Sequence, residues 1–352
     1  MEKALIAMSG GVDSSVAAWL LKEQGYDLAG AMMKLFVSEV ESGCCSAADA
    51  QDAREVAQRI GIPFYVFNFV DDFAAQVIDR FVAAYQSGAT PNPCIDCNRY
   101  LKFERFLRRA DELGIEKIAT GHYARITKEG SRRLLKKGLD PSKDQSYALY
   151  TMTQDQLART LFPLGELSKA EAREIAAAQG LVTAQKRDSQ DICFAPGGDY
   201  AGFIEGYTGV PAAPGFFKDT LGSTLGEHKG IIHYTIGQRK GLGISAGQPI
   251  YVCRVCPQTN TVVLGGQEEL YAKTLTARDI NLIAADRLDG PVQMRAKIRY
   301  NQTEQPATVW QLDEDTLRVE FAEPQRAITK GQAVVLYDGD VIVGGGVIED
   351  RF

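Results

Sequence analysis

The chain has 352 residues, of which 45% are hydrophobic, and a formal net charge of −6 at pH 7. This length favours two or three domains over one. The apolar run at residues 4–8 is too short for a signal peptide and lacks a basic flank, and no apolar run reaches the length of a membrane span. We therefore expect a cytoplasmic protein without a membrane partner, whose seven cysteines are catalytic or metal-binding and not disulfide-bonded.

The first third of the chain alternates strand and helix patterns. Strands are expected at 4–8, 28–34, 64–70 and 117–120, and helices at 12–24, 47–60, 71–87 and 98–113. This order predicts an α/β fold with a doubly wound, mostly parallel sheet. Ligands of such sheets bind at the carboxyl ends of the strands, so the loops at 9–15, 33–36 and 121–123 should lie together.

The later part of the chain changes character. Helices are expected at 154–160 and 168–179, the second with a capping box formed by Ser168 and Glu171. From about residue 220 strand patterns dominate, at 231–236, 250–255, 261–265, 292–299, 308–311, 317–321, 333–337 and 341–348. We expect three domains, at 1–206, 207–280 and 281–352, the last a small antiparallel β-barrel.

Residues 8–15, Met-Ser-Gly-Gly-Val-Asp-Ser-Ser, lie between a strand and a helix pattern. Two glycines let backbone N–H groups approach a ligand, and the helix N-terminus adds partial positive charge. Ser14 and Ser15 can bond the first free N–H groups of the helix or the ligand itself. A plain βα turn with a serine cap is the alternative. Asp13 fits a magnesium role, because a carboxylate beside a polyphosphate needs a cation between them. No Gly-Lys-Ser/Thr follows, which excludes a Walker loop.

Two loops carry cysteines that could act together. Cys94 and Cys97 follow Thr90-Pro-Asn-Pro93, a stiff loop, and we expect Cys97 just before the N-terminus of a helix, where the dipole and basic neighbours favour a thiolate. Cys193 lies in another polar turn. Together with a loop suited to a polyphosphate, this pattern suggests that one thiol carries sulfur as a persulfide and the other resolves it. The alternative is that each is a buried, unreactive thiol.

The other cysteines and the histidines give weaker signals. A zinc site made of two Cys-x-x-Cys pairs, 94/97 and 253/256, is disfavoured by their separation and by the strand pattern at 251–255. Cys253 and Cys256 are expected to be structural, and the adjacent Cys44 and Cys45 have no assignment. The three histidines lack metal-ligand spacing; His122 stands out only because it follows a strand that should end near the loop.

The charges are distributed unevenly. Residues 94–137 carry twelve Lys and Arg against six Asp and Glu, five of the basic ones at helical spacing over 99–109 and four in an expected hairpin at 132–137. An acidic protein with such a basic face can bind a polyanion locally. The alternative is a solvated helix face and a basic turn.

Several motifs in order resemble the MnmA family of tRNA-specific 2-thiouridylases, which are ATP pyrophosphatases with a pyrophosphate (PP) loop. They are Ser-Gly-Gly-Val-Asp-Ser-Ser at 9–15, Met33-Lys34, Thr-Pro-Asn-Pro at 90–93, Cys-Asn-Arg-Tyr-Leu-Lys-Phe at 97–103, Ala-Thr-Gly-His-Tyr-Ala-Arg at 119–125, Lys-Asp-Gln-Ser-Tyr at 143–147, Gln-Asp-Ile-Cys-Phe at 190–194, Tyr-Thr-Ile-Gly-Gln-Arg-Lys-Gly-Leu-Gly at 234–243 and Arg299-Tyr300. The resemblance covers nearly the whole chain.

The resemblance implies an ATP-dependent tRNA-uridine 2-sulfurtransferase, with a HUP-like PP-loop domain followed by two tRNA-binding domains. ATP and Mg²⁺ would be held by Met8, Ser9, Gly10, Gly11, Val12, Asp13, Ser14, Ser15, Met33 and Gly121. The C2 oxygen of the wobble uridine would be adenylated, a persulfide on Cys193 would deliver sulfur as AMP leaves, and Cys97 would resolve it and end in a disulfide with Cys193. By analogy, tRNA contacts would be Asn92, Pro93, Cys94, His122, Lys143, Asp144, Gln145, Arg299, Tyr300 and Gln332.

The resemblance also implies partners. These are tRNAs for Lys, Glu and Gln, and a persulfide donor such as a cysteine desulfurase or a sulfur-relay protein. Many family members have Asp in place of Cys94. Three thiols, Cys94, Cys97 and Cys193, could instead hold a [4Fe–4S] cluster with an open iron for sulfide. The rival functions are another adenylating ligase or amidotransferase with this loop, and a non-enzymatic nucleotide-sensing RNA-binding protein.

Overall fold

The computed structural model describes residues 1–36, 46–186, 192–245 and 247–352. The chain forms two compact units. The first comprises Met1–Ile78, Pro93–Pro196 and Gly339–Val343, and the second comprises the remaining residues. None of the helices within the described ranges is long and apolar enough to cross a membrane.

A five-stranded parallel sheet organises the first unit. Its strands are β1 (Lys3–Ala7), β2 (Asp27–Lys34), β3 (Phe64–Asn68), β4 (Lys117–Ala119) and β7 (Thr160–Leu161), in the order β3-β2-β1-β4-β7. The chain moves outward from β1 in both directions, so the strand order reverses between β1 and β4. This confirms the doubly wound α/β prediction, and a ligand site is expected beyond the carboxyl ends of these two strands.

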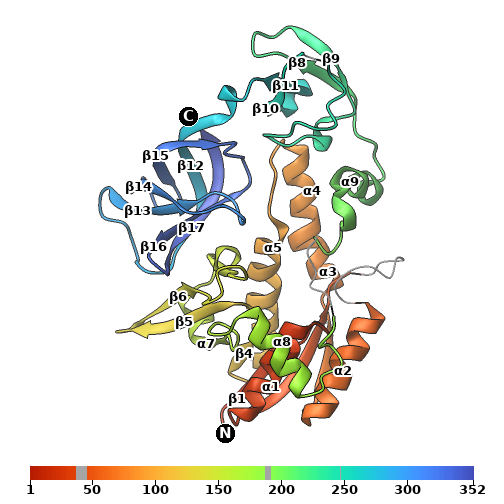
Figure 1. Cartoon of the computed structure of the whole chain (residues 1–352), viewed down its shortest axis with the longest axis vertical. Helices are drawn as coiled ribbons and strands as arrows, with labels where there is room; N and C mark the ends of the chain where they lie inside the picture. The colour runs from red at the N-terminus through yellow and green to blue at the C-terminus, as the bar shows by residue number, and fades with distance from the viewer. Residues whose placement is uncertain (37–45, 187–191, 246) are drawn as a thin grey trace. The chain divides into compact units, whose positions relative to one another are not determined.

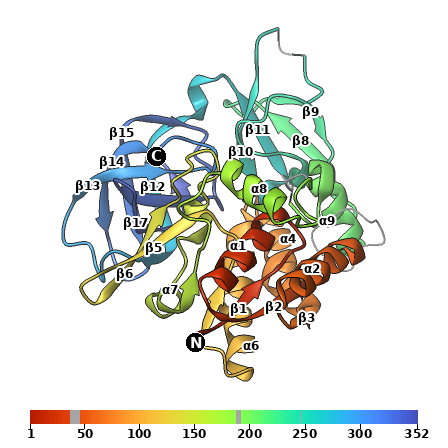
Figure 2. The same cartoon turned by 60° about the horizontal axis from the view of Figure 1, so that its bottom comes forward.

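Helices cover both faces of this sheet (Figures 1 and 2). On one face, α1 (Val12–Glu23), α2 (Ala47–Ile60) and α8 (Lys169–Ala178) share an apolar core with alternate residues of β1, including Ala4 and Ile6. On the other face, Phe106 of α6 (Phe106–Glu112) contacts Phe67 of β3. The strands β1 and β2 are buried over nearly their whole length, as expected for central strands of a parallel sheet that is covered on both faces.

Two helices depart from the predicted ones. The expected helix at 71–87 is α3 (Val70–Phe73), the π-helical η1 (Ala74–Ile78) and α4 (Asp79–Gln86). The helix expected to begin at Asn98 begins five residues earlier, at Pro93. It consists of α5 (Pro93–Asp96), the π-helical η2 (Cys97–Arg105) and α6. Proline fits the first position of a helix, because its N–H would have no intrahelical partner there. Of the two prolines around Asn92, Pro91 therefore lies before the helix and Pro93 is its first residue.

The first unit also contains a hairpin of β5 (Ala124–Glu129) and β6 (Arg132–Lys137), the 3₁₀ turn η3 (Ser146–Leu149), α7 (Gln154–Arg159) and the turn η4 (Pro196–Gly198), whose last two residues fall in the second unit. Arg125 of the hairpin bonds Asp340, which belongs to the same unit. The capping box predicted for Ser168 and Glu171 is present at the start of α8.

The second unit is built mainly of strands. After α9 (Tyr200–Thr208), a four-stranded sheet has the order β10-β11-β8-β9, with β8 (Gly215–Lys218), β9 (Thr224–His228), β10 (Tyr251–Cys256) and β11 (Thr261–Gly265). The strand predicted at 231–236 is wrong, because Ile231–His233 form a 3₁₀ turn, η5, after Gly230 at a φ of 122°. Two further 3₁₀ turns are η6 (Pro257–Thr259) and η7 (Glu268–Leu270).

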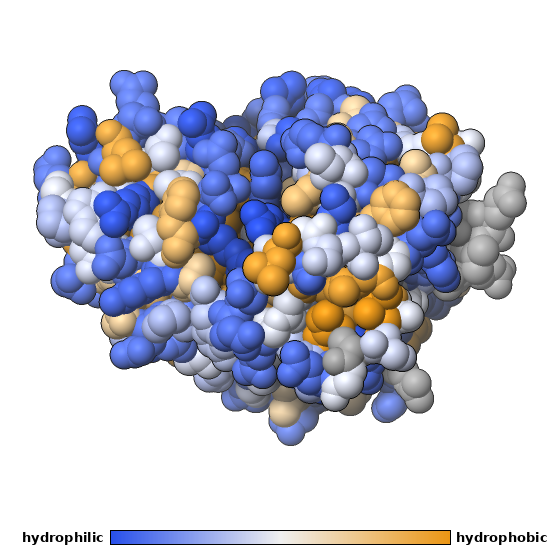
Figure 3. Space-filling model, turned by 90° about the horizontal axis from the view of Figure 1, so that it is seen from above, coloured by the Kyte–Doolittle hydropathy of each residue, from blue (hydrophilic) through white to orange (hydrophobic). Residues whose placement is uncertain are grey.

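The predicted C-terminal barrel is present. Its strands are β12 (Tyr271–Leu282), β13 (Val292–Lys297), β14 (Gln305–Gln311), β15 (Leu317–Arg326), β16 (Ala333–Asp338) and β17 (Val341–Arg351), and a pairing between β12 and β17 closes the sheet. Figure 3 shows hydrophilic side chains over most of the visible surface, with one larger hydrophobic patch and several smaller hydrophobic spots.

Candidate active site

The loop between β1 and α1 leaves the N-terminus of α1 without a side-chain cap. Gly11 is the N-cap of α1 and makes no side-chain cap. The two serines do not bond the helix N–H groups as expected. Ser15 donates to the carbonyl of Gly11 at 2.8 Å, and the Ser14 hydroxyl accepts the N–H of Ser9 at 3.1 Å. These bonds fix the loop, and the first N–H groups of α1 carry no side-chain cap that would compete with an anion.

Two glycines are required by close packing around this loop. Gly10 has a φ of 74°, and a Cβ there would lie 2.2 Å from the carbonyl oxygen of Asp49 in α2. A Cβ on Gly121, after β4, would lie 2.8 Å from the backbone nitrogen of Ser14. The resemblance places Gly121 among the ATP-binding residues; its close neighbour in the structure is the first turn of α1. Both glycines hold other elements against the loop.

Asp13 is held by two side chains that sequence reasoning did not single out. The Nζ of Lys169 lies 2.6 Å from Asp13 Oδ1, and the hydroxyl of Tyr123 donates to the same oxygen at 2.8 Å. Lys169 is buried at the first residue of α8, with its side chain 11% exposed. A lysine is rarely buried unless it is paired. Pairing with Asp13 therefore holds the Lys169 ammonium in a fixed place beside the loop.

A pocket of about 340 Å³ opens at the carboxyl ends of β1 and β4. Its size is within the usual range for small-molecule sites. Its lining includes predicted nucleotide and tRNA residues from several separate segments: Met8, Ser9, Asp13, Ser14, Met33, Pro93, Cys94, Cys97, Gly121, His122, Gln145 and Cys193. The fold thus brings together the loops at 9–15, 33–36 and 121–123, as the strand order predicted, and all three candidate cysteines line the same cavity.

The cysteines line this pocket from two segments. Cys94 is exposed and Cys97 is buried, and both lie within the helix that begins at Pro93, so Cys97 is not just before the helix as predicted. Its neighbour Asn98 does not cap the helix; it donates to the carbonyl of Ala148 at 2.9 Å. Phe194 follows Cys193 and packs edge-on against Phe73, with ring centroids 5.8 Å apart.

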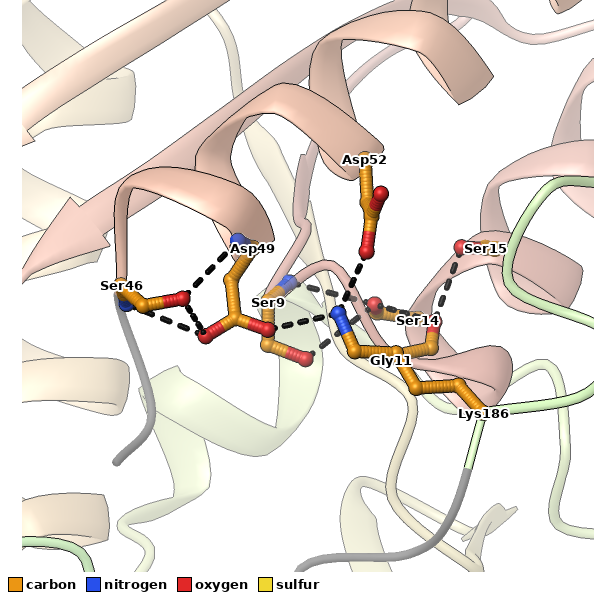
Figure 4. A network of polar contacts seen from close by, with 8 residues as sticks. All are labelled: Ser9, Gly11, Ser14, Ser15, Ser46, Asp49, Asp52 and Lys186. Carbon is orange, nitrogen blue, oxygen red and sulfur yellow. Dashed lines mark hydrogen bonds and ion pairs between the residues drawn. The ribbon is translucent and has the colours of Figure 1, made fainter. Parts of the chain in front are cut away.

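A polar network lies beside the loop, on the side of α2 (Figure 4). Ser46 caps α2 and accepts the N–H of Asp49, while Asp49 accepts the N–H of Ser46. The Nζ of Lys186 contacts Asp49 Oδ1 at 2.6 Å and Asp52 Oδ2 at 2.5 Å. These charges raise the pKa of Lys186 against the opposing effect of its burial, and hydrogen bonds from Lys186 and Ser46 lower the pKa of Asp49 although burial acts the other way.

Comparison with known proteins agrees with this arrangement. A family model described as tRNA methyl transferase HUP domain matches residues 2–197, followed by tRNA methyl transferase PRC-barrel domain at 201–266 and aminomethyltransferase beta-barrel domain at 272–348. The chain is 52% identical to the tRNA-specific 2-thiouridylase MnmA of Clostridioides difficile, over 99% of this chain and 98% of that protein, and 52% identical to that of Clostridium acetobutylicum, over 99% of each. The chain belongs to the MnmA family of tRNA-specific 2-thiouridylases.

A more distant likeness is to a solved structure described as the U34-tRNA thiolase NcsA from Methanococcus maripaludis with its [4Fe-4S] cluster. It is 18% identical, with a TM-score of 0.37, over 59% of this chain and 63% of that one. A likeness this low carries no argument about the cofactor of this MnmA-family chain.

Three predicted tRNA contacts of the first unit have clear local roles. His122 is buried and bonds Thr120 at 2.7 Å; burial and the charge of Lys102 hold its pKa well below the usual 6.5, so its ring is neutral. Gln145 accepts the backbone N–H of Tyr123 at 2.9 Å. Asp144 accepts N–H groups of residues 138 and 146, which fixes the turn before η3. Lys143 and Asp144 are not among the pocket residues.

The predicted contacts of the second unit lie near the barrel. Gln332 donates to the carbonyl of Thr90 at 2.7 Å, and Arg299 donates to the carbonyl of Ala327 at 2.7 Å. Tyr300 is 39% exposed. Asn92 belongs to the same unit.

The basic helix face is partly paired with acids. Arg105, Arg108 and Arg109 form exposed ion pairs with Asp72, Glu104 and Glu112. Exposed pairs of this kind contribute little to stability, and this part of the basic stretch fits the solvated face that was the alternative to a polyanion site.

The candidate metal ligands are Asp13 and the pocket cysteines. Mg²⁺ usually takes one or two carboxylates together with substrate phosphates, and Asp13 beside the loop fits that pattern. Among the described residues no three His, Cys, Asp or Glu side chains are grouped to hold a metal ion. The three pocket cysteines, which line the cavity from two segments, are accordingly not grouped as a set of metal ligands in this structure. Cys253 is buried, and burial together with Glu269 raises the pKa of its thiol, which suits a structural role. Cys44 and Cys45 lie outside the described residues.

Proposed function

We propose that this protein performs ATP-dependent 2-thiolation of the wobble uridine of tRNA. The observation that carries the proposal is the single pocket lined by the PP-loop, by Cys94 and Cys97, and by Cys193. ATP bound by the loop can adenylate an oxygen of the substrate, and a thiol at the same cavity can then deliver sulfur in place of that oxygen. Another adenylating ligase would not need cysteines from two segments at this place, and neither would a nucleotide sensor.

In the first step the uridine C2 oxygen attacks the α-phosphate of ATP and pyrophosphate leaves. The loop N–H groups and the N-terminus of α1 stabilise the pyrophosphate. Asp13 would hold Mg²⁺, which would neutralise the charge on the phosphates. Lys169 and Tyr123 keep Asp13 in one orientation. Adenylation makes the C2 oxygen, which is a poor leaving group, depart as part of AMP.

In the second step a persulfide on Cys193 supplies the sulfur. Its terminal sulfur forms a bond to C2, and the bond from C2 to the adenylate oxygen breaks as AMP leaves. The Cys97 thiolate then attacks Cys193 Sγ, which breaks the S–S bond, leaves sulfur on C2 and forms a Cys97–Cys193 disulfide. A thiol reductant must supply two electrons to reopen this disulfide before the next turnover, and a persulfide donor must reload Cys193.

The tRNA-binding part of the proposal rests on the family resemblance. A base must be unstacked to enter a pocket, and an anticodon loop permits this at low cost. We assign tRNA contacts to Pro93, Cys94, His122 and Gln145, which line the pocket, and to Asn92, Lys143, Asp144, Arg299, Tyr300 and Gln332, which do not. We assign tRNA binding to the domains at 207–280 and 281–352, the tRNAs for Lys, Glu and Gln as acceptors, and a cysteine desulfurase or relay protein as donor.

The experiment is to incubate the protein with Mg·ATP, a cysteine desulfurase with cysteine, a thiol reductant and unmodified tRNA, and to measure 2-thiouridine by mass spectrometry of nucleosides. We expect 2-thiouridine at the wobble position, and none with Cys193→Ser. If no tRNA with a wobble uridine gains sulfur with or without oxygen, the proposed function is wrong.

The same assay separates persulfide from cluster delivery. Persulfide transfer predicts a colourless, active protein and substantial activity in Cys94→Ala. A cluster predicts absorption at about 400 nm after anaerobic purification, from iron–sulfur charge transfer, and loss of both colour and thiolation in Cys94→Ala.

A further inference from the structure

The hairpin of β5 and β6 carries an excess of positive charge. Its two strands and their turn, residues 124–137, contain six Lys and Arg against one Glu, in a protein whose net charge is −6. Figure 1 shows the hairpin projecting from the first unit. Charges of one sign repel one another, so this concentration calls for either acidic partners within the protein or an anionic ligand.

The register of the hairpin places like charges directly opposite each other twice. Arg125 lies opposite Lys136, and Lys128 lies opposite Arg133. Like charges in directly opposite positions destabilise a pair of strands. The two pairs lie on opposite faces of the hairpin, because Arg125 and Lys128 are separated by an odd number of positions along the same strand.

An acidic side chain compensates the first of these pairs. Arg125 lies 2.8 Å from one carboxylate oxygen of Asp340, and the Nζ of Lys136 lies 3.9 Å from the other. In contrast, neither Lys128 nor Arg133 forms an ion pair with any residue in the parts of the chain that the structure describes. Lys128 is exposed and Arg133 is half-buried. The second pair is therefore a repulsion that no ion pair within the described chain offsets.

Both ends of the hairpin lead to residues that line the pocket. β5 begins two residues after His122, which is one of the lining residues. After β6, the N–H of Gly138 donates to Asp144 at 3.0 Å, and the next residue, Gln145, also lines the pocket. A strand rises about 3.3 Å per residue, so Lys128 lies at most about 20 Å from His122. A few nucleotides of one RNA strand can span that distance.

We propose that Lys128 and Arg133 form a contact site for the phosphate backbone of the tRNA whose wobble base enters the pocket. A polyanion supplies the opposite charge that this pair lacks, and Lys and Arg that neutralise phosphates release counterions from the nucleic acid. The inference rests on the proposed function and adds to it a contact in the first unit that depends on charge and not on base sequence.

The test is the salt dependence of tRNA binding in the double variant Lys128→Gln/Arg133→Gln. Dissociation constants for unmodified tRNA are measured by filter binding between about 50 and 200 mM salt. Each lost phosphate contact reduces the slope of log K against log salt by about 0.7–0.9, so the slope should become shallower by about 1.5. The dissociation constant should rise at least about fivefold at the lowest salt, and saturating tRNA should restore the wild-type rate of thiolation.

A matched control removes the same charge elsewhere in the first unit. Arg108→Gln/Arg109→Gln takes two exposed arginines from α6, each paired with a glutamate, and should leave the slope and the dissociation constant unchanged. Thermal unfolding separates a structural role from an RNA contact. Because the substitutions in the hairpin remove a repulsion between opposite strand positions, they should leave the melting temperature unchanged or raise it.

Four outcomes would overturn the inference. They are a wild-type slope in the hairpin variant, weaker binding without a change of slope, an equal loss of slope in the α6 variant, and a lower melting temperature of the hairpin variant that accounts for its weaker binding. A wild-type protein that binds tRNA but forms no 2-thiouridine would instead overturn the proposed function.

Discussion

Replacing Lys169 by Met should weaken the binding of Mg·ATP. The substitution removes the ammonium that lies 2.6 Å from Asp13 Oδ1 while keeping a side chain of similar length. Asp13 then loses a charged partner just where the phosphates add negative charge. The Tyr123 hydroxyl bond remains, but it supplies no positive charge.

The magnitude follows from the contact. A hydrogen bond to a charged group contributes about 1.5–3 kcal/mol. The Asp13 side chain is 35% exposed, so solvent screens part of this interaction and the lower half of the range applies. Since about 1.4 kcal/mol corresponds to a factor of ten, the dissociation constant should rise about tenfold.

The assay is calorimetric titration with α,β-methylene-ATP and Mg²⁺, which binds without being cleaved between the α- and β-phosphates. Asp13→Asn and the double variant complete a cycle, and their effects should be non-additive because the two residues are in contact. Thermal unfolding verifies that each variant is folded. The reasoning is refuted if folded Lys169→Met binds the analogue like the wild type, or if the two substitutions are additive.

Three further outcomes are expected. Gly10→Ala should destabilise the protein by clearly more than the roughly 1–2 kcal/mol cost of a positive φ, whereas Gly25→Ala, with a φ of 85° and nothing within 4 Å, should cost only that amount; equal urea midpoints would contradict this. His122 has a pKa lowered by burial and then by Lys102, so the stability it contributes is present above its unfolded pKa near 6.5 and is lost as pH falls below it; the drop in urea midpoint from about pH 7 to 5 should shrink in His122→Gln, and an unchanged drop would exclude this cause. Cys253, whose pKa is raised by burial, should react with iodoacetamide far more slowly than the exposed Cys94 when peptides are mapped by mass spectrometry, and equal labelling would contradict its structural role.

The parts of this fold that sequence predicted are those with strong local signals. The alternation of apolar strands with capped helices located β1 to β4 and, with the strand order, the end of the sheet where the pocket lies. The errors occurred where a second local signal outweighed the one that the prediction used. Pro93 was predicted to lie in a stiff loop but is the first residue of a helix. The apolar residues Ile231–His233 form a 3₁₀ turn after Gly230, although their composition favours a strand.

The charged partners of the site were missed for a different reason. Lys169 follows the predicted cap of its helix, and Lys186 lies near the Cys193 motif, so both were visible as basic residues. Which acid each would meet depends on α8 and α2 packing beside α1, and no periodicity in the sequence reports that. A lysine at the start of an apolar helix face was the one available signal, because a cation there is expected to need a buried partner.

The absence of a side-chain cap at Gly11 has a consequence for the enzyme without its nucleotide. A Ser, Thr, Asp or Asn at this position would stabilise α1 by about 1 kcal/mol, but its oxygen would occupy the N–H groups that face the phosphates. Glycine leaves α1 without a side-chain cap, so under the proposed function the bound nucleotide would act as the missing cap of a core helix. Binding of ATP should then raise the melting temperature of the first unit, because any ligand that binds only the folded state stabilises it. A cell low in ATP would hold this enzyme in its least stable form.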